Sequence, residues 1–185
     1  FTIYDTDDQM SVVKRAVKDL DLDAEQFPPR MILSRISNAK NVRATPDDFR
    51  NQAETYNDEI VARVYPVYQQ MLRQYQALDF DDLLNRTVEL FQNVPEVVRR
   101  YHERYRNIMV DEYQDTNHVQ YSLIHALAES PTANICVVGD EDQSIYAFRG
   151  ADITNIRNFK RDYPTAKTIF LEQNYRSTQP ILEAA

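Results

Sequence analysis

The sequence of 185 residues contains very little glycine: only Gly139 and Gly150 are present. Glycine ordinarily makes up about 7% of a protein and supplies the left-handed backbone of tight hairpin turns. Its scarcity excludes collagen-like repeats and glycine-rich turns, and it predicts a chain dominated by helix. The length suffices for one ordinary domain or for two small ones.

Cysteine, long apolar runs and positive charge are also scarce. The single cysteine, Cys136, excludes a disulfide framework and a cysteine-rich zinc site, and it indicates a reducing, cytoplasmic compartment. No apolar run approaches the roughly 18 residues of a membrane span, and residues 1–5 lack the features of a signal peptide, so we expect a soluble protein without a membrane partner. With 21 basic and 29 acidic residues the net charge is −8, so any nucleic-acid site has to be local.

Residues 1 to about 106 are predicted to form helices joined by short polar turns, without a strand. Apolar residues recur there three and four positions apart, and capping residues or prolines mark several helix starts. Pro66 is expected to kink or break the longest helix. The expected helices are one capped by Asp5 or Thr6, one around Ile32, one that begins at Pro46, one over about 57–77, one over 80–91 and one that Pro95 opens.

After residue 106 the hydrophobic pattern changes. Short continuous apolar runs predict buried parallel strands near residues 107–111, 134–139 and 167–171. Helical patterns lie between them, at residues 118–128 and 152–163. This alternation is typical of an α/β layered domain, in which ligands bind at the carboxyl ends of the strands.

Two adjacent carboxylates, Asp111 and Glu112, follow the first expected strand. From the strand tip Asp111 can reach a metal ion while Glu112 points toward a water molecule, which is the physical arrangement of a Walker B motif. An acidic turn without a catalytic role is the alternative interpretation of this pattern. The first strand therefore offers a candidate metal ligand and a candidate general base.

The loop after the second expected strand combines an amide, two aromatic residues and an arginine. Both glycines of the chain frame this loop, residues 139–150, which indicates that its backbone geometry matters. Gln143 can contact a phosphate without adding charge. Tyr146 and Phe148 can stack on bases, and Arg149 can pair with a phosphate. The alternative is that the two aromatic rings pack in the core and Arg149 is solvated.

A third polar stretch, residues 171–178, follows the third expected strand and contains Tyr175. Ser177 can cap a following helix whose first turn holds Pro180. Arg176 lies just before that helix start, where anions are favoured. Taken alone, this stretch is a weak motif, and its meaning depends on the two stretches that precede it.

Together the three stretches are specific. Residues 110–116 (VDEYQDT), 137–151 (VVGDEDQSIYAFRGA) and 171–178 (LEQNYRST) resemble motifs II, III and IV of the superfamily 1 DNA helicases of the UvrD, Rep and PcrA type. Residues 78–83 (LDFDDL) also match that group. The resemblance implies an α/β fold, with a helical subdomain similar to subdomain 1B over residues 1–80. A partial RecA-like parallel sheet with flanking helices, of the P-loop NTPase type, is expected over residues 81–185.

The same resemblance implies a nucleotide site for ATP and Mg²⁺. In it Asp111 is the magnesium ligand and Glu112 activates the attacking water. Gln143 contacts the γ-phosphate. Tyr175 stacks on the adenine, and Arg176 contacts the γ-phosphate as an arginine-finger-like group that stabilises the transferring phosphoryl.

On the DNA side, the resemblance places Tyr146, Phe148 and Arg149 on a track for single-stranded DNA. Helicases of this group usually carry tryptophan where this chain has Phe148. The phenylalanine ring still offers a face on which a base can stack, but its stacking is expected to be weaker than that of tryptophan. The implied activity is ATP-dependent 3′ to 5′ DNA unwinding in repair or replication. The implied partners are single-stranded DNA, single/double-strand junctions and the remaining helicase domains.

A phosphate-cradling P-loop is absent from the sequence, because neither Gly139 nor Gly150 is followed by Lys-Ser or Lys-Thr. In the family this loop precedes the position of Phe1, and a second RecA-like domain follows that of Ala185. The chain, which also begins without methionine, is therefore interpreted as an interior fragment whose P-loop strand is missing from mid-sheet. The fragment can close this gap, leave the neighbouring strands loose or pair with another copy.

Two other classes of function compete with a helicase fragment. One is a DNA- or protein-binding module that has no catalysis because the P-loop is lacking. The other is a metal-dependent hydrolase or nuclease, which is disfavoured because the polar loops supply glutamine, aromatic residues and arginine where a nuclease needs a basic residue beside paired carboxylates. Its candidate ligands would be Asp111, Asp115, Asp140 and Asp142.

Tyrosine is abundant in the helical half, and the family resemblance makes these rings tempting as DNA contacts. Their spacing along one helix instead predicts packing between helices. The tyrosines concerned are Tyr56, Tyr65, Tyr68 and Tyr75.

Overall fold

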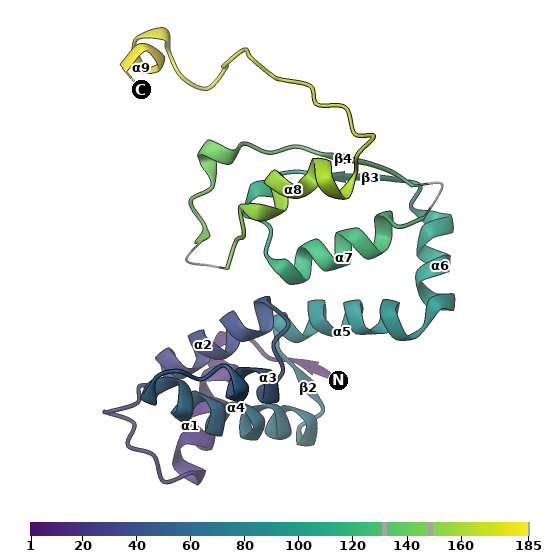
Figure 1. The fold of residues 1–185 in the computed structure, drawn as a ribbon. Helices are drawn as coiled ribbons and strands as arrows, with labels where there is room; N and C mark the ends of the chain where they lie inside the picture. Colours follow the sequence, from purple (N-terminus) through teal and green to yellow (C-terminus); the bar gives the residue numbers. More distant parts are fainter. Residues whose placement is uncertain (131–132, 148–149, 185) are drawn as a thin grey trace.

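The computed structural model describes residues 1–130, 133–147 and 150–184. Figure 1 shows a helical half that contains the N-terminus and a second half in which helices flank a small sheet. The helices are α1 (Thr6–Asp19), α2 (Pro29–Asn41), α3 (Pro46–Asn51), α4 (Tyr56–Gln74), α5 (Phe80–Asn93), α6 (Pro95–Arg104), α7 (His118–Ala128), α8 (Thr154–Asp162) and α9 (Gln179–Ala184). The strands are β1 (Thr2–Ile3), β2 (Ala77–Leu78), β3 (Asn107–Val110) and β4 (Asn134–Val137), and two short 3-10 turns are η1 (Tyr113–Asp115) and η2 (Glu141–Gln143).

The helix starts predicted from capping residues are confirmed. The Asp5 carboxylate accepts hydrogen bonds from the backbone N–H groups of Asp7 and Asp8 at the start of α1, and Thr45 caps α3 before Pro46. Of the kink or break predicted at Pro66, the break is wrong, because α4 continues through that residue. Buried side chains on both sides of Pro66 pack against α1 and α3. This packing offsets the stability lost with the one helix hydrogen bond that proline cannot donate.

The main core lies between α1, α2 and α4. Tyr65 and Tyr68 are buried in it, so the prediction that they pack between helices is confirmed. The same prediction is wrong for Tyr56 and Tyr75, whose side chains are 63% and 42% exposed. These two residues occupy the first position and the C-cap of α4, where a neighbouring helix covers less of the ring.

The prediction that residues 1 to about 106 contain no strand is wrong, because the helical half contains a strand pair. The two-residue strands β1 and β2 pair in parallel, with Thr2 opposite Ala77 and Ile3 opposite Leu78. Each segment is two residues long, which is too short to show the period-two pattern by which a strand is predicted. The pairing ties the beginning of the described chain to the segment between α4 and α5.

In the second half, β3 and β4 pair in parallel over their whole length, from Asn107 opposite Asn134 to Val110 opposite Val137. Two of the three predicted strands are therefore confirmed. The prediction that they are buried is wrong: alternate side chains are exposed, including Met109 and the single cysteine, Cys136. One face of this two-stranded sheet is thus left largely uncovered.

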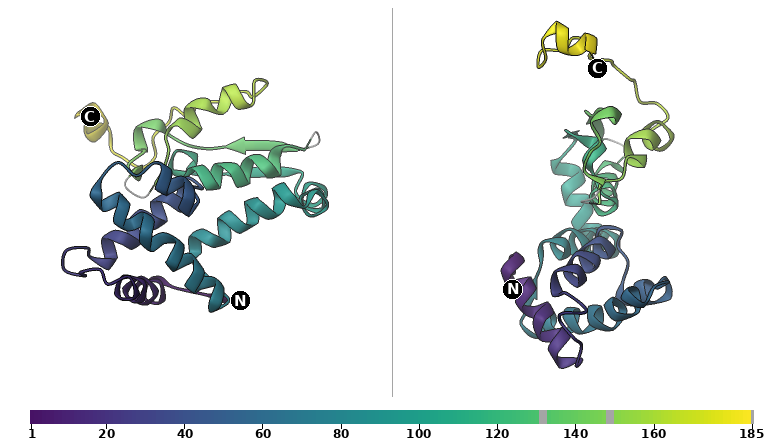
Figure 2. Two further views of the ribbon diagram at one scale, coloured as in Figure 1. Left: turned by 60° about the horizontal axis from the view of Figure 1, so that its bottom comes forward. Right: turned by 90° about the vertical axis from the view of Figure 1, so that its left-hand side faces the viewer.

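The third predicted strand, at residues 167–171, is wrong. This segment is extended but has no ladder partner, and Figure 1 and the right-hand view of Figure 2 show the chain after α8 leading away from the sheet. Ile169, Phe170 and Leu171 are 82%, 78% and 83% exposed. An apolar run becomes a strand only beside another strand, and within the described residues the sheet of β3 and β4 has no third member.

No helix in the described part of the chain is both long and apolar enough to cross a membrane.

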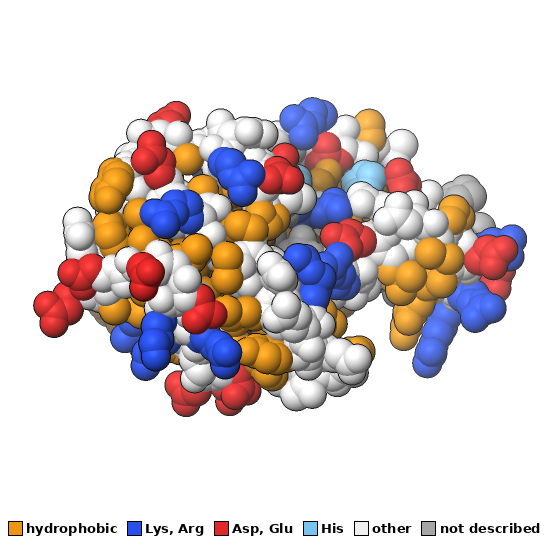
Figure 3. Space-filling model, turned by 90° about the horizontal axis from the view of Figure 1, so that it is seen from below, with side chains coloured by type: hydrophobic (Ala, Val, Ile, Leu, Met, Phe, Trp, Pro, Cys, Tyr) orange, Lys and Arg blue, Asp and Glu red, His pale blue; other side chains and the backbone are white. Residues whose placement is uncertain are grey.

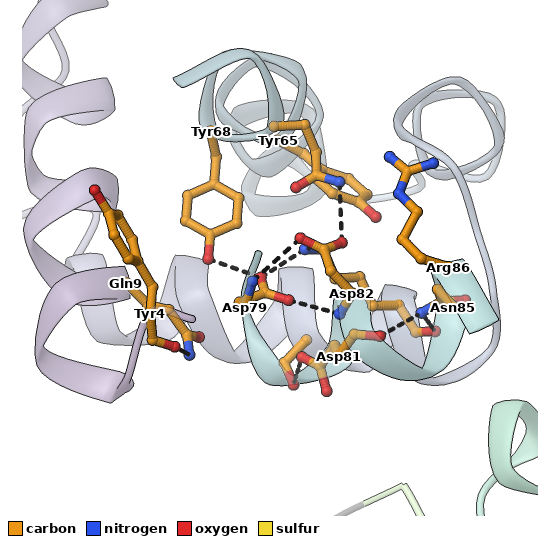
Figure 4. A network of polar contacts seen from close by, with 12 residues as sticks. Tyr4, Gln9, Tyr65, Tyr68, Asp79, Asp81, Asp82, Asn85 and Arg86 are labelled. Atoms are coloured by element: carbon orange, nitrogen blue, oxygen red, sulfur yellow. Dashed lines mark hydrogen bonds and ion pairs between the residues drawn. The ribbon is translucent and has the colours of Figure 1, made fainter. Parts of the chain in front are cut away.

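A buried ionic network joins α2 to the start of α5 (Figure 4). The ammonium group of Lys40 lies 2.5 Å from Asp79 and 2.8 Å from Asp82, and all three side chains are almost fully buried. The Tyr68 hydroxyl donates a third hydrogen bond to the Asp79 carboxylate, at 2.8 Å. Burial raises the pKa of the neighbouring Asp81 carboxyl, against the hydrogen bond that it accepts from the hydroxyl of Ser37. The network fixes the point where the chain leaves the helical core.

We expect Lys40→Met to lower the free energy of unfolding by about 3–5 kcal/mol, because it leaves two buried carboxylates without a counter-charge. The measurement is urea denaturation of the chain. Arg15→Ala, which removes the exposed ion pair of Arg15 with Asp19, is the control and should change the same quantity by less than about 1 kcal/mol. Equal effects of the two substitutions would show that the network is dispensable.

Candidate functional site

The candidate site lies at the carboxyl end of the β3–β4 sheet, where Asp111 and Glu112 follow β3. Glu112 has a left-handed backbone (φ 50°), and its N–H donates a 2.9 Å hydrogen bond to the carboxylate of Asp111. The next N–H, of Tyr113, donates to the carbonyl of Val138 at 2.9 Å. The sharp turn after β3 is thus held against the end of β4. A hollow beside it is lined by Val110, Asp111, Glu112, Asp115, Thr116, Gln120, Leu123 and Ile124.

A buried amide connects the two loops of the site. The side chain of Gln114 is 1% exposed; its Nε2 donates to the Glu112 carboxylate at 2.7 Å, and its Oε1 accepts from the backbone N–H of Asp140 at 3.1 Å. Both ends of the amide are therefore occupied, one in each loop. Gln114 was not among the predicted site residues, although its uncharged amide between Glu112 and Asp115 was an available signal.

The two glycines serve this arrangement in different ways, which confirms that backbone geometry matters in the loop. A methyl group at Gly139 would lie 2.7 Å from Gln114 Oε1 and 2.9 Å from Ile156 Cδ1, so glycine is needed there for close approach. Gly150 has a φ of +86°, a conformation that side chains other than glycine rarely adopt.

Two of the nucleotide-site candidates come together in the structure. Gln143 Nε2 donates to the Asp140 carboxylate at 2.7 Å, and Arg176 Nη1 lies 3.5 Å from Gln143 Oε1. Asp140 in turn is the residue whose N–H bonds to Gln114. Tyr175 is not brought into this group: its ring is 92% exposed.

The candidates for contact with DNA are only partly described. Tyr146 is about one-third exposed and lines a second hollow with Asp115, Asn117 and Gln120. Phe148 and Arg149 lie outside the described residues. Of the three residues of the expected track, the structure therefore describes Tyr146.

The carboxylates of the site fit a magnesium ion that phosphates help to bind. Asp111 is exposed at the sheet edge and offers hard oxygen atoms, which suit Mg²⁺. Within the described residues no three His, Cys, Asp or Glu side chains gather as a metal cage. Magnesium commonly uses one or two carboxylates plus substrate phosphates, so a single ligand such as Asp111 is compatible with it. The four aspartates considered for a nuclease do not form such a group.

The comparison with known proteins gives one family and several close relatives. A sequence model of the UvrD/REP helicase N-terminal domain matches residues 1–164. The chain is 54% identical over all its 185 residues to a protein of Staphylococcus aureus (strain Mu50 / ATCC 700699) named ATP-dependent DNA helicase PcrA. It is 53% identical over the same length to the protein of that name from Staphylococcus epidermidis (strain ATCC 12228 / FDA PCI 1200). The chain spans about a quarter of the length of these curated relatives (25%).

Gly139→Ala is expected to push the Gln114 amide away from its two partners and to lower the free energy of unfolding by about 1–3 kcal/mol. Thermal or urea unfolding measures the loss. The matched test is the same substitution in a Gln114→Ala background, where the clash with Oε1 is gone. There Gly139→Ala should lower the free energy of unfolding by at most half as much as it does in the wild-type background. An identical loss in both backgrounds would contradict the role given to Gln114.

Proposed function

The chain belongs to the UvrD/REP helicase N-terminal domain family, and we propose that it forms part of an ATP-dependent helicase that moves 3′ to 5′ along single-stranded DNA in repair or replication. The observation that carries the proposal is the contact path from Glu112 through Gln114 and Asp140 to Gln143 and Arg176. It joins residues of all three helicase-like stretches at one edge of the sheet, where α/β folds bind their ligands.

On the nucleotide side, each residue of this path has a distinct task. Glu112 accepts the proton of the attacking water, and the Gln114 amide holds its carboxylate in one orientation. Gln143 and Arg176 face the γ-phosphate, where the guanidinium stabilises the charge of the transferring phosphoryl. Asp111 would hold a magnesium ion, which would supply positive charge to offset that of the phosphates. Tyr175, whose ring is 92% exposed, stacks on the adenine.

On the DNA side, Tyr146, Phe148 and Arg149 form the single-strand track, with stacking on the rings and a phosphate contact at the guanidinium. Binding is local and does not depend on a general positive field. Figure 3 supports this: on the face seen there, Lys and Arg side chains are interspersed with Asp and Glu. The partners are single-stranded DNA and single/double-strand junctions.

The two halves of the chain correspond to two different helicase subdomains in this proposal. We assign residues 1–80 to a helical subdomain like 1B and residues 81–185 to a partial RecA-like domain like 1A, of the P-loop NTPase type. The remaining helicase domains of a longer protein supply the P-loop and the second RecA-like domain. These 185 residues lack a glycine-rich loop that ends in Lys-Ser or Lys-Thr, which favours a second candidate function for the chain alone: binding without catalysis.

We expect the isolated 185-residue chain not to hydrolyse ATP, because positioning supplies most of the catalysis in phosphoryl transfer and the phosphate cradle is missing. In a full-length protein that contains it, ATP hydrolysis should be stimulated by single-stranded DNA. There Glu112→Gln should lower kcat by about 10²-fold or more. Phosphate release with and without single-stranded DNA is the measurement. Turnover by the isolated chain that Glu112→Gln abolishes would overturn the first expectation, and an active full-length Glu112→Gln variant would overturn the second.

A further inference from the structure

The last residue of α2, Asn41, links the two halves of the chain through a buried side chain. It is 8% exposed, and its Oδ1 accepts a 2.9 Å hydrogen bond from Nδ2 of Asn117, a residue 76 positions later in the sequence. Asn117 is equally buried. A buried amide contact between segments so far apart fixes their relative position, because each polar group loses a partner if they separate.

The orientation of this amide pair follows from the bonds around it. Asn117 Oδ1 accepts the N–H of Gln120, as the cap of α7, and its Nδ2 donates to Asn41 Oδ1. Asn41 must therefore present its oxygen to Asn117, which turns its own Nδ2 away. That Nδ2 faces Gly150: a methyl group there would lie 3.0 Å from it.

Both sides of the contact rest on well-bonded elements. On the α2 side, the preceding residue Lys40 is held by the buried carboxylates of α5, and its carbonyl accepts from Asn85 Nδ2 at 3.0 Å. On the other side, Asn155 of α8 donates to the carbonyls of Thr116 and Asn117, at 3.0 and 3.5 Å. Asn41 thus connects α2, which is bonded to the start of α5, with the cap of α7, which is bonded to α8. This contact lies at the end of the loop that carries Gln143 and Tyr146.

We propose that Asn41 is a positioning residue that sets the place of this loop relative to the helical half. Its side chain packs closely against Gly150 at one end of the loop, while Gln114 accepts a hydrogen bond from the N–H of Asp140 at the other end. If the helical half moves, α2 moves the loop with it through the contact of Asn41. If the loop moves, the same contact moves the helical half. The expected effect of Asn41 on unwinding rests on the proposed function. The expected effect of Asn41 on the loop does not depend on that function.

The first test measures backbone hydrogen exchange in the 185-residue chain. Asn41→Ala removes both contacts, and Asn41→Asp keeps an acceptor for Asn117 but puts an oxygen in place of the Nδ2 that faces Gly150. Both variants should speed exchange at the N–H groups of Gly150 and Ala151 about tenfold or more, with α1 unchanged. Asn38→Asp, the same change at an exposed position of the same helix, should leave these N–H groups unaffected. Unchanged exchange in the Asn41 variants, or an equal rise in α1, would overturn the inference.

The second test uses a full-length protein that contains this chain. Asn41→Asp should lower the rate of duplex unwinding about fivefold or more while the KM for ATP and the single-strand-stimulated kcat for ATP stay within about twofold. Parallel losses of unwinding and hydrolysis would overturn the positioning role. If the wild-type protein shows no DNA-stimulated hydrolysis, the proposed function fails, and the exchange measurement still decides the inference.

Discussion

The buried amide of Gln114 is the interaction on which the candidate site depends. Its two ends bond to the Glu112 carboxylate and to the Asp140 backbone, so one side chain fixes the distance between the loops after β3 and β4. Gly139 is required because a larger residue would occupy the space of the Gln114 oxygen. A neutral side chain suits this position, since it orients a carboxylate without adding charge to the site.

A second set of buried polar contacts connects the site with the helical half. Lys40 ties α2 to α5 through two carboxylates, and the adjacent Asn41 ties α2 to the cap of α7. The β3–β4 sheet itself has only two strands in the described residues, and one of its faces is largely exposed. Polar contacts of defined geometry, more than burial of the sheet, therefore place the loops of the site.

Much of the fold could be predicted from local sequence signals. Helix starts at Asp5, Thr45 and Pro95 follow from capping chemistry, which acts within a few residues. The strand predicted at residues 167–171 failed because a strand depends on its neighbour, which local hydrophobicity does not reveal. Tyr56 and Tyr75 follow the same spacing as Tyr65 and Tyr68, but they lie at the ends of α4 and outside the core.

The site was predictable as a set of residue types but not as a set of contacts. Asp111, Glu112, Gln143 and Arg176 were predicted from motif order, whereas Gln114 and Asn41, which connect the surrounding loops, act through partners far along the chain. For Asn41, nothing in the immediate sequence marks such a role, and for Gln114 the one local signal is its place between two acidic residues.

The most direct test of the account is single-strand-stimulated ATP hydrolysis by a full-length protein that carries Gln114→Met, which keeps the length of the side chain but removes both hydrogen bonds. If Gln114 orients Glu112 for catalysis, kcat falls about tenfold or more while the KM for ATP changes little. An unchanged kcat in a folded variant would contradict the account.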